Sequence, residues 1–268
     1  MIQVSIENDF LSWRTAARNL LRNGISPHDI LWTTTEQSGL FECFAERSKE
    51  LKTFKVSAEF LELAEFVSCV NETNKWALLY RLLFRLTHEN RNLLEIESDD
   101  DVRQALLYVK AIRRDVHKMH AFVRFRKIEN GCQEMFVAWH EPQHFIVKKA
   151  APFFARRFGA MHFSILTPKG CAHWNLENLT FTPGVSVQDA PQADEMERFW
   201  QTYYASIFNP ARLKVKAMKA EMPIRFWKNL PEAKLLPNLI RQAEERTKEM
   251  INQKARRADV VKKLSEKS

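Results

Sequence analysis

The pattern of apolar and polar residues predicts helices in the first half of the chain. Residues 10–22 carry apolar side chains at helical spacing, and Asn23-Gly24 gives a stop signal. A 3.6-residue period returns from Ser57, and residues 75–86 are apolar on nearly every side, as in the centre of a helix bundle. Three aspartates, residues 99–101, precede a helix expected at about 102–117. We interpret them as a helix cap and not as a metal site.

The middle of the chain predicts a small sheet. Residues 122–126 alternate as in a half-buried strand, and further strands are expected at 134–140, 162–166, 172–174 and 179–181. Short connections favour antiparallel pairing. Helical periodicity returns at 194–207 and continues towards the end. The sequence therefore predicts an α+β fold, mainly helical, with helices packed around a small central antiparallel sheet.

Charge divides the chain unevenly. Residues 1–102 hold 11 Lys and Arg against 17 Asp and Glu, a net of −6, and the remaining residues hold 30 against 16, a net of +14. We expect an acidic, mainly helical region at 1–98, a basic α+β core with C-terminal helices at 99–253, and a flexible basic tail at 254–268. The basic part indicates a polyanionic partner, although basic residues also serve solubility alone.

Composition and the cysteine pattern argue against a membrane protein and against a zinc or iron–sulfur protein. No run approaches the roughly 18 apolar residues of a membrane helix, and the N-terminus has no leader pattern, so we expect a cytoplasmic protein without membrane contact. The four cysteines at positions 43, 69, 132 and 171 are far apart. They predict neither a structural zinc site nor an iron–sulfur cluster, and we expect no cofactor.

Two runs suggest nucleic acid as the polyanion. Residues 112–126 contain four Arg, one Lys and two His, and residues 203–227 interleave Tyr, Phe and Trp with Arg and Lys. On the helix before the sheet, Arg103, Lys110, Arg114 and His117 fall on one face. The alternative is a solvated helix face beside an edge strand blunted by charge.

Sequence signatures of catalysis are weaker than those of nucleic-acid binding. His140-Glu141-Pro142-Gln143-His144 matches the letters HExxH, but Pro142 disfavours the helix that zinc binding by this motif needs. The alternative is a turn from a strand into a helix. Asp115, His117 and His120 could form an acid–base site. The chain has no Gly-rich phosphate loop and no GxSxG elbow, so nucleotide hydrolysis and serine esterase activity lack their usual signatures.

Several motifs together resemble an uncharacterised bacterial family, a domain of unknown function associated with DNA metabolism or DNA repair. They are RRDVHKMHAFVRFR, AWHEP, FARRF, ILTP, FTPG and YYASIFNPARLKVKAMKAEMPIRFWKNLPEA, with WRTAARNLLRNGISPHDILW near the start. The resemblance spans about residues 13–250. Its members are encoded beside a radical SAM protein, or carry the domain fused to a uracil-DNA glycosylase-like domain. Where the family often has an acidic residue and Gly after the position of Trp174, this chain has Asn175-Leu176.

The resemblance implies a protein that binds DNA as an accessory to a radical SAM or uracil-DNA glycosylase-like partner. It carries over motif positions but no established catalytic residues. Alternatives are a DNA-processing enzyme that uses Asp115, His117 and His120, and a protein-interaction scaffold. The residues expected to contact nucleic acid are Arg113, Arg114, Lys118, Arg124, Arg126, Tyr203, Tyr204, Asn209, Arg212 and Lys214, and His120 would join the tyrosines in meeting bases or sugars.

Overall fold

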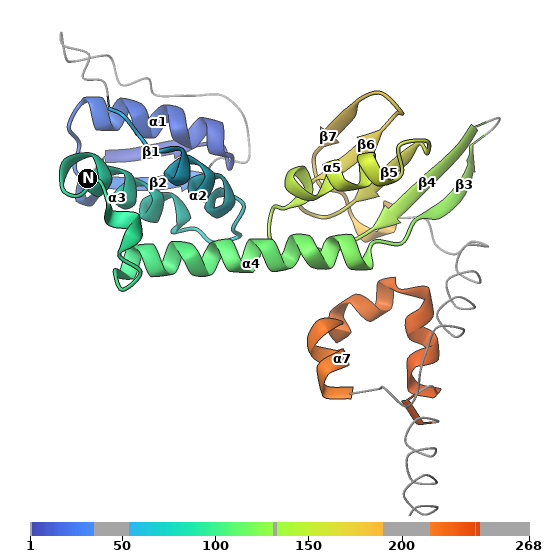
Figure 1. Ribbon diagram of the computed structural model, residues 1–268. Coiled ribbons are helices and arrows are strands. Elements are labelled where there is room, and N and C mark those ends of the chain that lie inside the picture. Colours follow the sequence, from blue (N-terminus) through green and yellow to red (C-terminus); the bar gives the residue numbers. More distant parts are fainter. Residues whose placement is uncertain (1, 35–53, 131–132, 190–214, 239, 242–268) are drawn as a thin grey trace, which may run out of the picture. The chain divides into compact units, whose positions relative to one another are not determined.

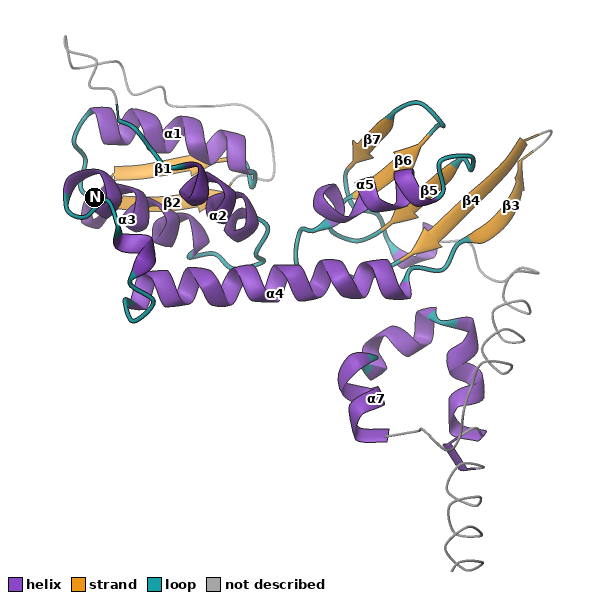
Figure 2. Ribbon diagram, in the orientation of Figure 1, coloured by secondary structure: helices purple, strands orange, loops and turns teal. Residues whose placement is uncertain are grey.

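The computed structural model describes residues 2–34, 54–130, 133–189, 215–238 and 240–241 (Figure 1). The chain forms two compact units. The first unit is Met1–Met119 with Pro142–Ala150, and the second unit is His120–Glu141 with Ala151–Ser268. Helices and strands occur in both, so the fold mixes α and β structure as expected (Figure 2). The predicted boundary at residues 98 and 99 rests on charge and stays a prediction.

The first unit begins with a strand, a helix and a parallel strand: β1 (Ile2–Ile6), α1 (Phe10–Arg22) and β2 (Ile30–Thr34). Asp9 caps α1 by accepting from the amides of Leu11 and Ser12 at 2.8 and 3.0 Å. Gly24, at a φ of 66°, ends it. The predicted helix is confirmed, whereas the two strands were not predicted.

Two further helices complete the core of this unit, α2 (Ala58–Ser68) and α3 (Lys75–His88). Ser57 caps α2 through its hydroxyl, which accepts from the Phe60 amide at 3.2 Å. Trp13 of α1 stacks on Trp76 of α3, with ring centroids 6.2 Å apart. Both helices were predicted, because their caps and apolar periods are local signals.

Lys75 lies inside this core with 2% of its surface exposed. Its Nζ donates to the carbonyls of Ser68 and Val70, both at 2.7 Å, and lies 4.6 Å from the centroid of the Trp76 ring. Burial lowers the pKa of Lys75 to about 8. The ammonium group therefore closes the C-terminal end of α2, where helix carbonyls lack helical partners.

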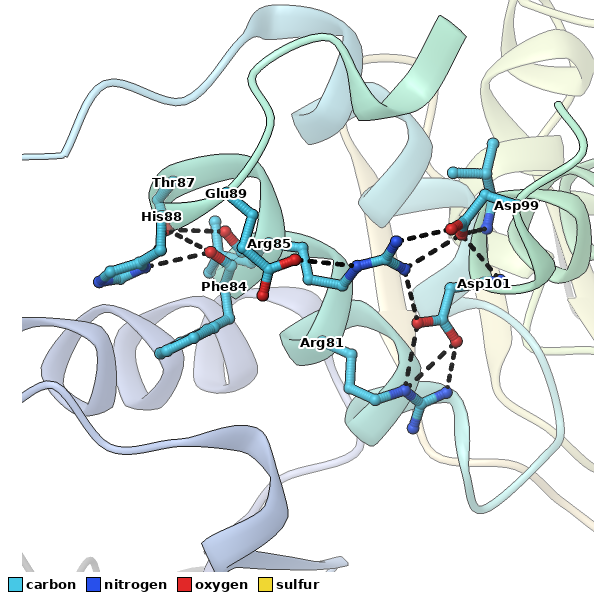
Figure 3. Close-up of polar contacts among 10 residues, drawn as sticks. Arg81, Phe84, Arg85, Thr87, His88, Glu89, Asp99 and Asp101 are labelled. Atoms are coloured by element: carbon cyan, nitrogen blue, oxygen red, sulfur yellow. Dashed lines mark hydrogen bonds and ion pairs between the residues drawn. The ribbon is translucent and has the colours of Figure 1, made fainter. Parts of the chain in front are cut away.

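The long helix α4 (Asp100–Phe122) begins at an ion-pair cluster, shown in Figure 3. Asp99 accepts from the amides of Asp101 and Val102 and pairs with Arg85 at 2.6 Å, and Arg81 pairs with Asp101 at 2.7 Å. The hydrogen bond from Arg85 lowers the pKa of Asp99. The predicted capping role is confirmed, and the described residues contain no group of three or more potential metal ligands.

The second unit contains a five-stranded sheet in the order β3-β4-β5-β6-β7. The predicted strand at 122–126 is misplaced, because α4 continues to Phe122 and β3 begins only at Arg126. The other predicted strands are confirmed within a residue or two. The five strands of the sheet are β3 (Arg126–Asn130), β4 (Gln133–Trp139), β5 (Phe163–Leu166), β6 (Cys171–Trp174) and β7 (Leu179–Thr182).

The sheet is mixed and not purely antiparallel. β4 and β5 pair in parallel, with Phe136 opposite Phe163, while the other three pairs are antiparallel. The cause is α5 (Val147–Arg157), which lies between β4 and β5 in the chain and supplies the crossover that parallel strands need. Phe154 of α5 contacts Phe125 and Phe158 in the aromatic core beside the sheet.

The β6–β7 turn contains Asn175 and Leu176, where the resemblance leads one to expect an acidic residue and Gly. Leu176 has a φ of 76°, a left-handed conformation that glycine adopts without steric cost. The Asn175 side chain accepts from the amides of Glu177 and Asn178 at 3.1 and 2.7 Å, a role a carboxylate also fills. An acidic residue followed by Gly would therefore suit this turn.

Two of the resemblance motifs, ILTP and FTPG, meet at one point of the second unit. The Val185 amide donates to the Thr167 carbonyl at 3.1 Å. A Cβ on Gly184 would lie 2.2 Å from the Pro168 oxygen, which is too close for any side chain. These motifs therefore shape a turn and a close backbone approach.

The described C-terminal segment is α7 (Val215–Glu221) followed by two 3₁₀ helices, η5 (Ile224–Asn229) and η6 (Pro231–Leu235). Phe226 stacks on Phe122 and on His140, with centroids 5.5 and 5.2 Å apart. His140 is 1% exposed, and burial lowers its pKa to about 4. The helix predicted at 194–207 and the tail at 254–268 lie outside the described residues.

Candidate nucleic-acid interface

One side of α4 carries an exposed basic face, defined as Lys110, Arg113, Arg114 and His117. At 100° per residue these positions fall within an arc of about 100°. The opposite side is held inside by an apolar seam that includes Val109 and Ile112. The basic face is therefore a consequence of how α4 packs, and the predicted stripe is confirmed as exposed.

The cations of the basic face differ from Arg103 of the same helix, because no carboxylate of the described residues neutralises them. Arg103, also in the predicted stripe, pairs with Asp100 at 2.7 Å. Lys110, Arg113 and Arg114 have no ion pair with a carboxylate of the described residues. Their charge is thus available to an external anion.

An aromatic ring adjoins this face. The guanidinium carbon of Arg113 lies 5.1 Å from the centroid of Phe66, and Lys149 Nζ lies 4.3 Å from the same centroid. Lys149 also approaches Glu65 at 3.6 Å. A half-buried ring thereby holds two cations close together on the surface of the first unit. Lys149 and Phe66 were not among the predicted site residues, because the bounds of α5 were not predicted and Phe66 looks like an ordinary helix residue.

Two of the three proposed acid–base residues, Asp115 and His117, lie on different sides of α4. Asp115 is 2% exposed and accepts from the His144 amide at 3.0 Å, whereas His117 is exposed on the other side of α4. His120 belongs to the second unit, where it stacks on Phe153 with centroids 4.2 Å apart. An acid–base role for the three residues stays a prediction.

The other predicted contacts differ in their surroundings. Lys118 is 5% exposed, so its ammonium group does not lie on the surface. Arg124 Nη1 donates to the carbonyls of Ala121 and Val123 at 2.7 and 3.2 Å, and Arg126 is half-buried at the start of β3. The remaining predicted contacts, Tyr203, Tyr204, Asn209, Arg212 and Lys214, lie outside the described residues.

The HExxH letters do not form a helical zinc motif. His140 follows the last residue of β4, and residues 140–146 are not helical. Glu141 accepts from the Trp139 indole at 3.0 Å and pairs with Lys228 at 2.8 Å. His144 Nδ1 accepts from the Asn71 amide at 3.2 Å. The expectation that this run is not helical is confirmed, and it forms the turn from β4 into α5.

The two described cysteines are both free, Cys69 half-buried and Cys171 buried. Burial raises the pKa of Cys69. Cys43 and Cys132 lie outside the described residues. Among the helices that the structure describes, none has both the length and the apolar character required to cross a membrane.

Comparison with known families matches residues 73–232, more than half of the chain, to DUF4130, a domain of unknown function. The chain belongs to the DUF4130 family. No curated protein and no solved structure matches it. The DUF4130 match covers α4 with its basic face and the whole five-stranded sheet, and it leaves out α1 and α2. The resemblance to a domain of unknown function is thus confirmed, and its association with DNA repair stays a prediction.

Proposed function

We propose that this protein binds DNA through the basic face of α4, as an accessory to an enzyme of DNA repair or modification. The observation that carries the proposal is a set of cations on one helical face that no described carboxylate neutralises. The partner would be the radical SAM protein or the uracil-DNA glycosylase-like protein that the family resemblance implies.

The spacing of the basic face supports contact with a phosphate backbone. Lys110 and Arg114 are four residues apart, which corresponds to about 6 Å along the helix. Each DNA strand carries a phosphate about every 3.4 Å along a duplex, so two to three phosphates lie within reach of this face. Lys149, which lies on the same Phe66 ring as Arg113, extends the positive surface beside it.

The test is fluorescence anisotropy with labelled single-stranded and duplex DNA over a series of salt concentrations. Binding should weaken steeply with salt, because phosphate contacts release counterions. The variant Lys110→Gln/Arg114→Gln should bind more weakly and reduce the magnitude of the duplex salt slope by roughly 1 to 2. This pair is chosen because Arg124 already donates to backbone carbonyls.

A matched control removes two exposed charges of the same types elsewhere in the first unit, Lys55→Gln/Arg91→Gln. It should leave the salt slope close to that of the unmodified protein. Equal losses in both double variants would mean that total charge, and not the basic face, governs binding. Absence of binding at low salt would reject the proposal for the isolated protein and favour the scaffold alternative.

A further inference from the structure

A cavity of about 350 Å³ opens in the first unit among α1, α2, α3 and the segment that leads into α2. Ligand pockets in proteins run from about 300 to 1,000 Å³, so this one suits a small molecule. Most of it lies outside the family match, since of its lining residues only Leu83 falls within residues 73–232. It is separate from the basic face of α4.

Apolar side chains form most of the cavity wall. Phe54, Val56 and Leu61 line the cavity and are half-buried. Trp13 and Phe60 also line it, are each 1% exposed and belong to the packed core, where Trp13 stacks on Trp76. Apolar walls favour a flat or acyl group over a hydrated one.

Three arginines also line the cavity. Arg14, Arg18 and Arg22 follow one another at intervals of four residues, which places them in a row along α1. Arg14 and Arg18 are exposed and Arg22 is half-exposed. None of them forms an ion pair with a carboxylate of the described residues. Apolar walls beside unneutralised guanidinium groups complement a molecule with an apolar body and an anionic head.

We infer that this cavity binds a small amphipathic organic anion, with its apolar body against Phe54, Val56 and Leu61 and its carboxylate or phosphate at the arginine row. The inference goes beyond DNA binding and does not rest on it. The body can be aromatic, as in a nucleoside monophosphate, or acyl, as in a medium-chain fatty acid, and the two sources share the chemistry described above.

The experiment uses the full chain and two fluorescent probes. Anilinonaphthalene sulfonate carries an aromatic body with one anionic group, and N-phenyl-1-naphthylamine has a similar body without charge. Arg18→Gln should weaken binding of the anionic probe by about fivefold or more and leave the neutral probe unchanged. The matched control Arg91→Gln, an exposed arginine of the same unit away from the cavity, should change neither.

A second variant fills the space. Ala17→Leu adds bulk to the cavity wall and should weaken binding of both probes, with thermal unfolding as the check that the protein still folds. Unchanged affinity for the anionic probe in Arg18→Gln would overturn the inference. An equal loss in Arg91→Gln would overturn it as well, because binding would then follow total charge.

Competition identifies the source of the anion. Displacement of the anionic probe by thymidine 5′-monophosphate supports an aromatic body, and displacement by decanoate supports an acyl body. Failure of both to displace a probe bound at the cavity would overturn the assignment to phosphates and carboxylates. DNA anisotropy with Arg18→Gln should remain unchanged, so failure of one proposal leaves the other intact.

Discussion

Lys75 in the first unit and His140 in the second unit are both buried basic side chains, but the protein accommodates them differently. Lys75 donates to two carbonyls at 2.7 Å and keeps a pKa of about 8. His140 packs against Phe226, its Nε2 has no hydrogen-bond partner among the described residues, and its pKa falls to about 4. The first site retains a charge at neutral pH, whereas the second retains a neutral ring. The two units should therefore respond differently to mutation and to pH.

The largest effect is expected from Lys75→Ala. The substitution leaves a cavity in the core and removes the donors of two carbonyls, so the free energy of unfolding should fall by about 3–5 kcal/mol. Lys75→Met keeps the volume and should lose less. Urea unfolding of both variants measures the difference. Unchanged stability in Lys75→Met would show that the ammonium donors contribute nothing and would break the comparison.

Acid should destabilise the second unit through His140. Its folded pKa lies below the unfolded value of about 6.5, so the unfolded state binds the extra proton between pH 6.5 and 4. Stability is therefore present above pH 6.5 and is lost as the pH falls towards 4, by on the order of 3 kcal/mol. Region-resolved hydrogen exchange from pH 7 to pH 4.5 should show this loss in β4 and η5.

The control for that measurement is His140→Phe, which keeps a ring beside Phe226 but cannot titrate. Its stability should lose the His140 component of the pH dependence. An unchanged acid slope in this variant would mean that other groups cause the destabilisation.

Arg85→Ala tests the ion-pair cluster of the first unit, in which Asp99 and Asp101 neutralise Arg85 (Figure 3). The variant removes the partner of the Asp99 cap and should lower the free energy of unfolding by about 1–2 kcal/mol. DNA affinity should not change, because Arg85 is already paired. A loss of DNA binding without a loss of stability would instead assign Arg85 to the interface.

The smallest predicted effect has the opposite sign and lies in the second unit. Leu176→Gly relieves a left-handed backbone conformation and should raise the free energy of unfolding by about 0.5–1 kcal/mol, net of the flexibility that glycine adds to the unfolded chain. Thermal unfolding measures the shift. Leu176→Ala is the control, because it shortens the side chain without relieving the backbone and should not stabilise the protein.

Helices were predictable because their signals are local. Ser57, Asp99 and Gly24 mark helix ends within a few residues of the apolar period they bound. The β1–β2 pair was missed because Ile2 finds its partner Ile30 only through tertiary structure. The parallel β4–β5 pairing was missed because Pro152, which normally argues against a helix interior, lies inside the crossover helix α5.

The candidate site was predictable only in part, because helical spacing is a local signal whereas packing depends on tertiary structure. Helical spacing placed Lys110 and Arg114 on an exposed face, and they are exposed. Basic character alone also selected Lys118, which the helix turns inwards beside the buried Met119. The cavity was not predictable, because Trp13 and Phe60 come from helices whose meeting leaves no mark in either segment.

The contact between Gly184 and Pro168 bears on how this family can diverge. Any side chain at position 184 would collide with the backbone carbonyl of Pro168. Substitutions elsewhere in the sheet would not easily relieve that collision. We expect the two motifs to be inherited together, even in relatives whose α4 carries other side chains. Family membership recognised by these motifs would then trace ancestry of the fold more faithfully than it traces a shared ligand.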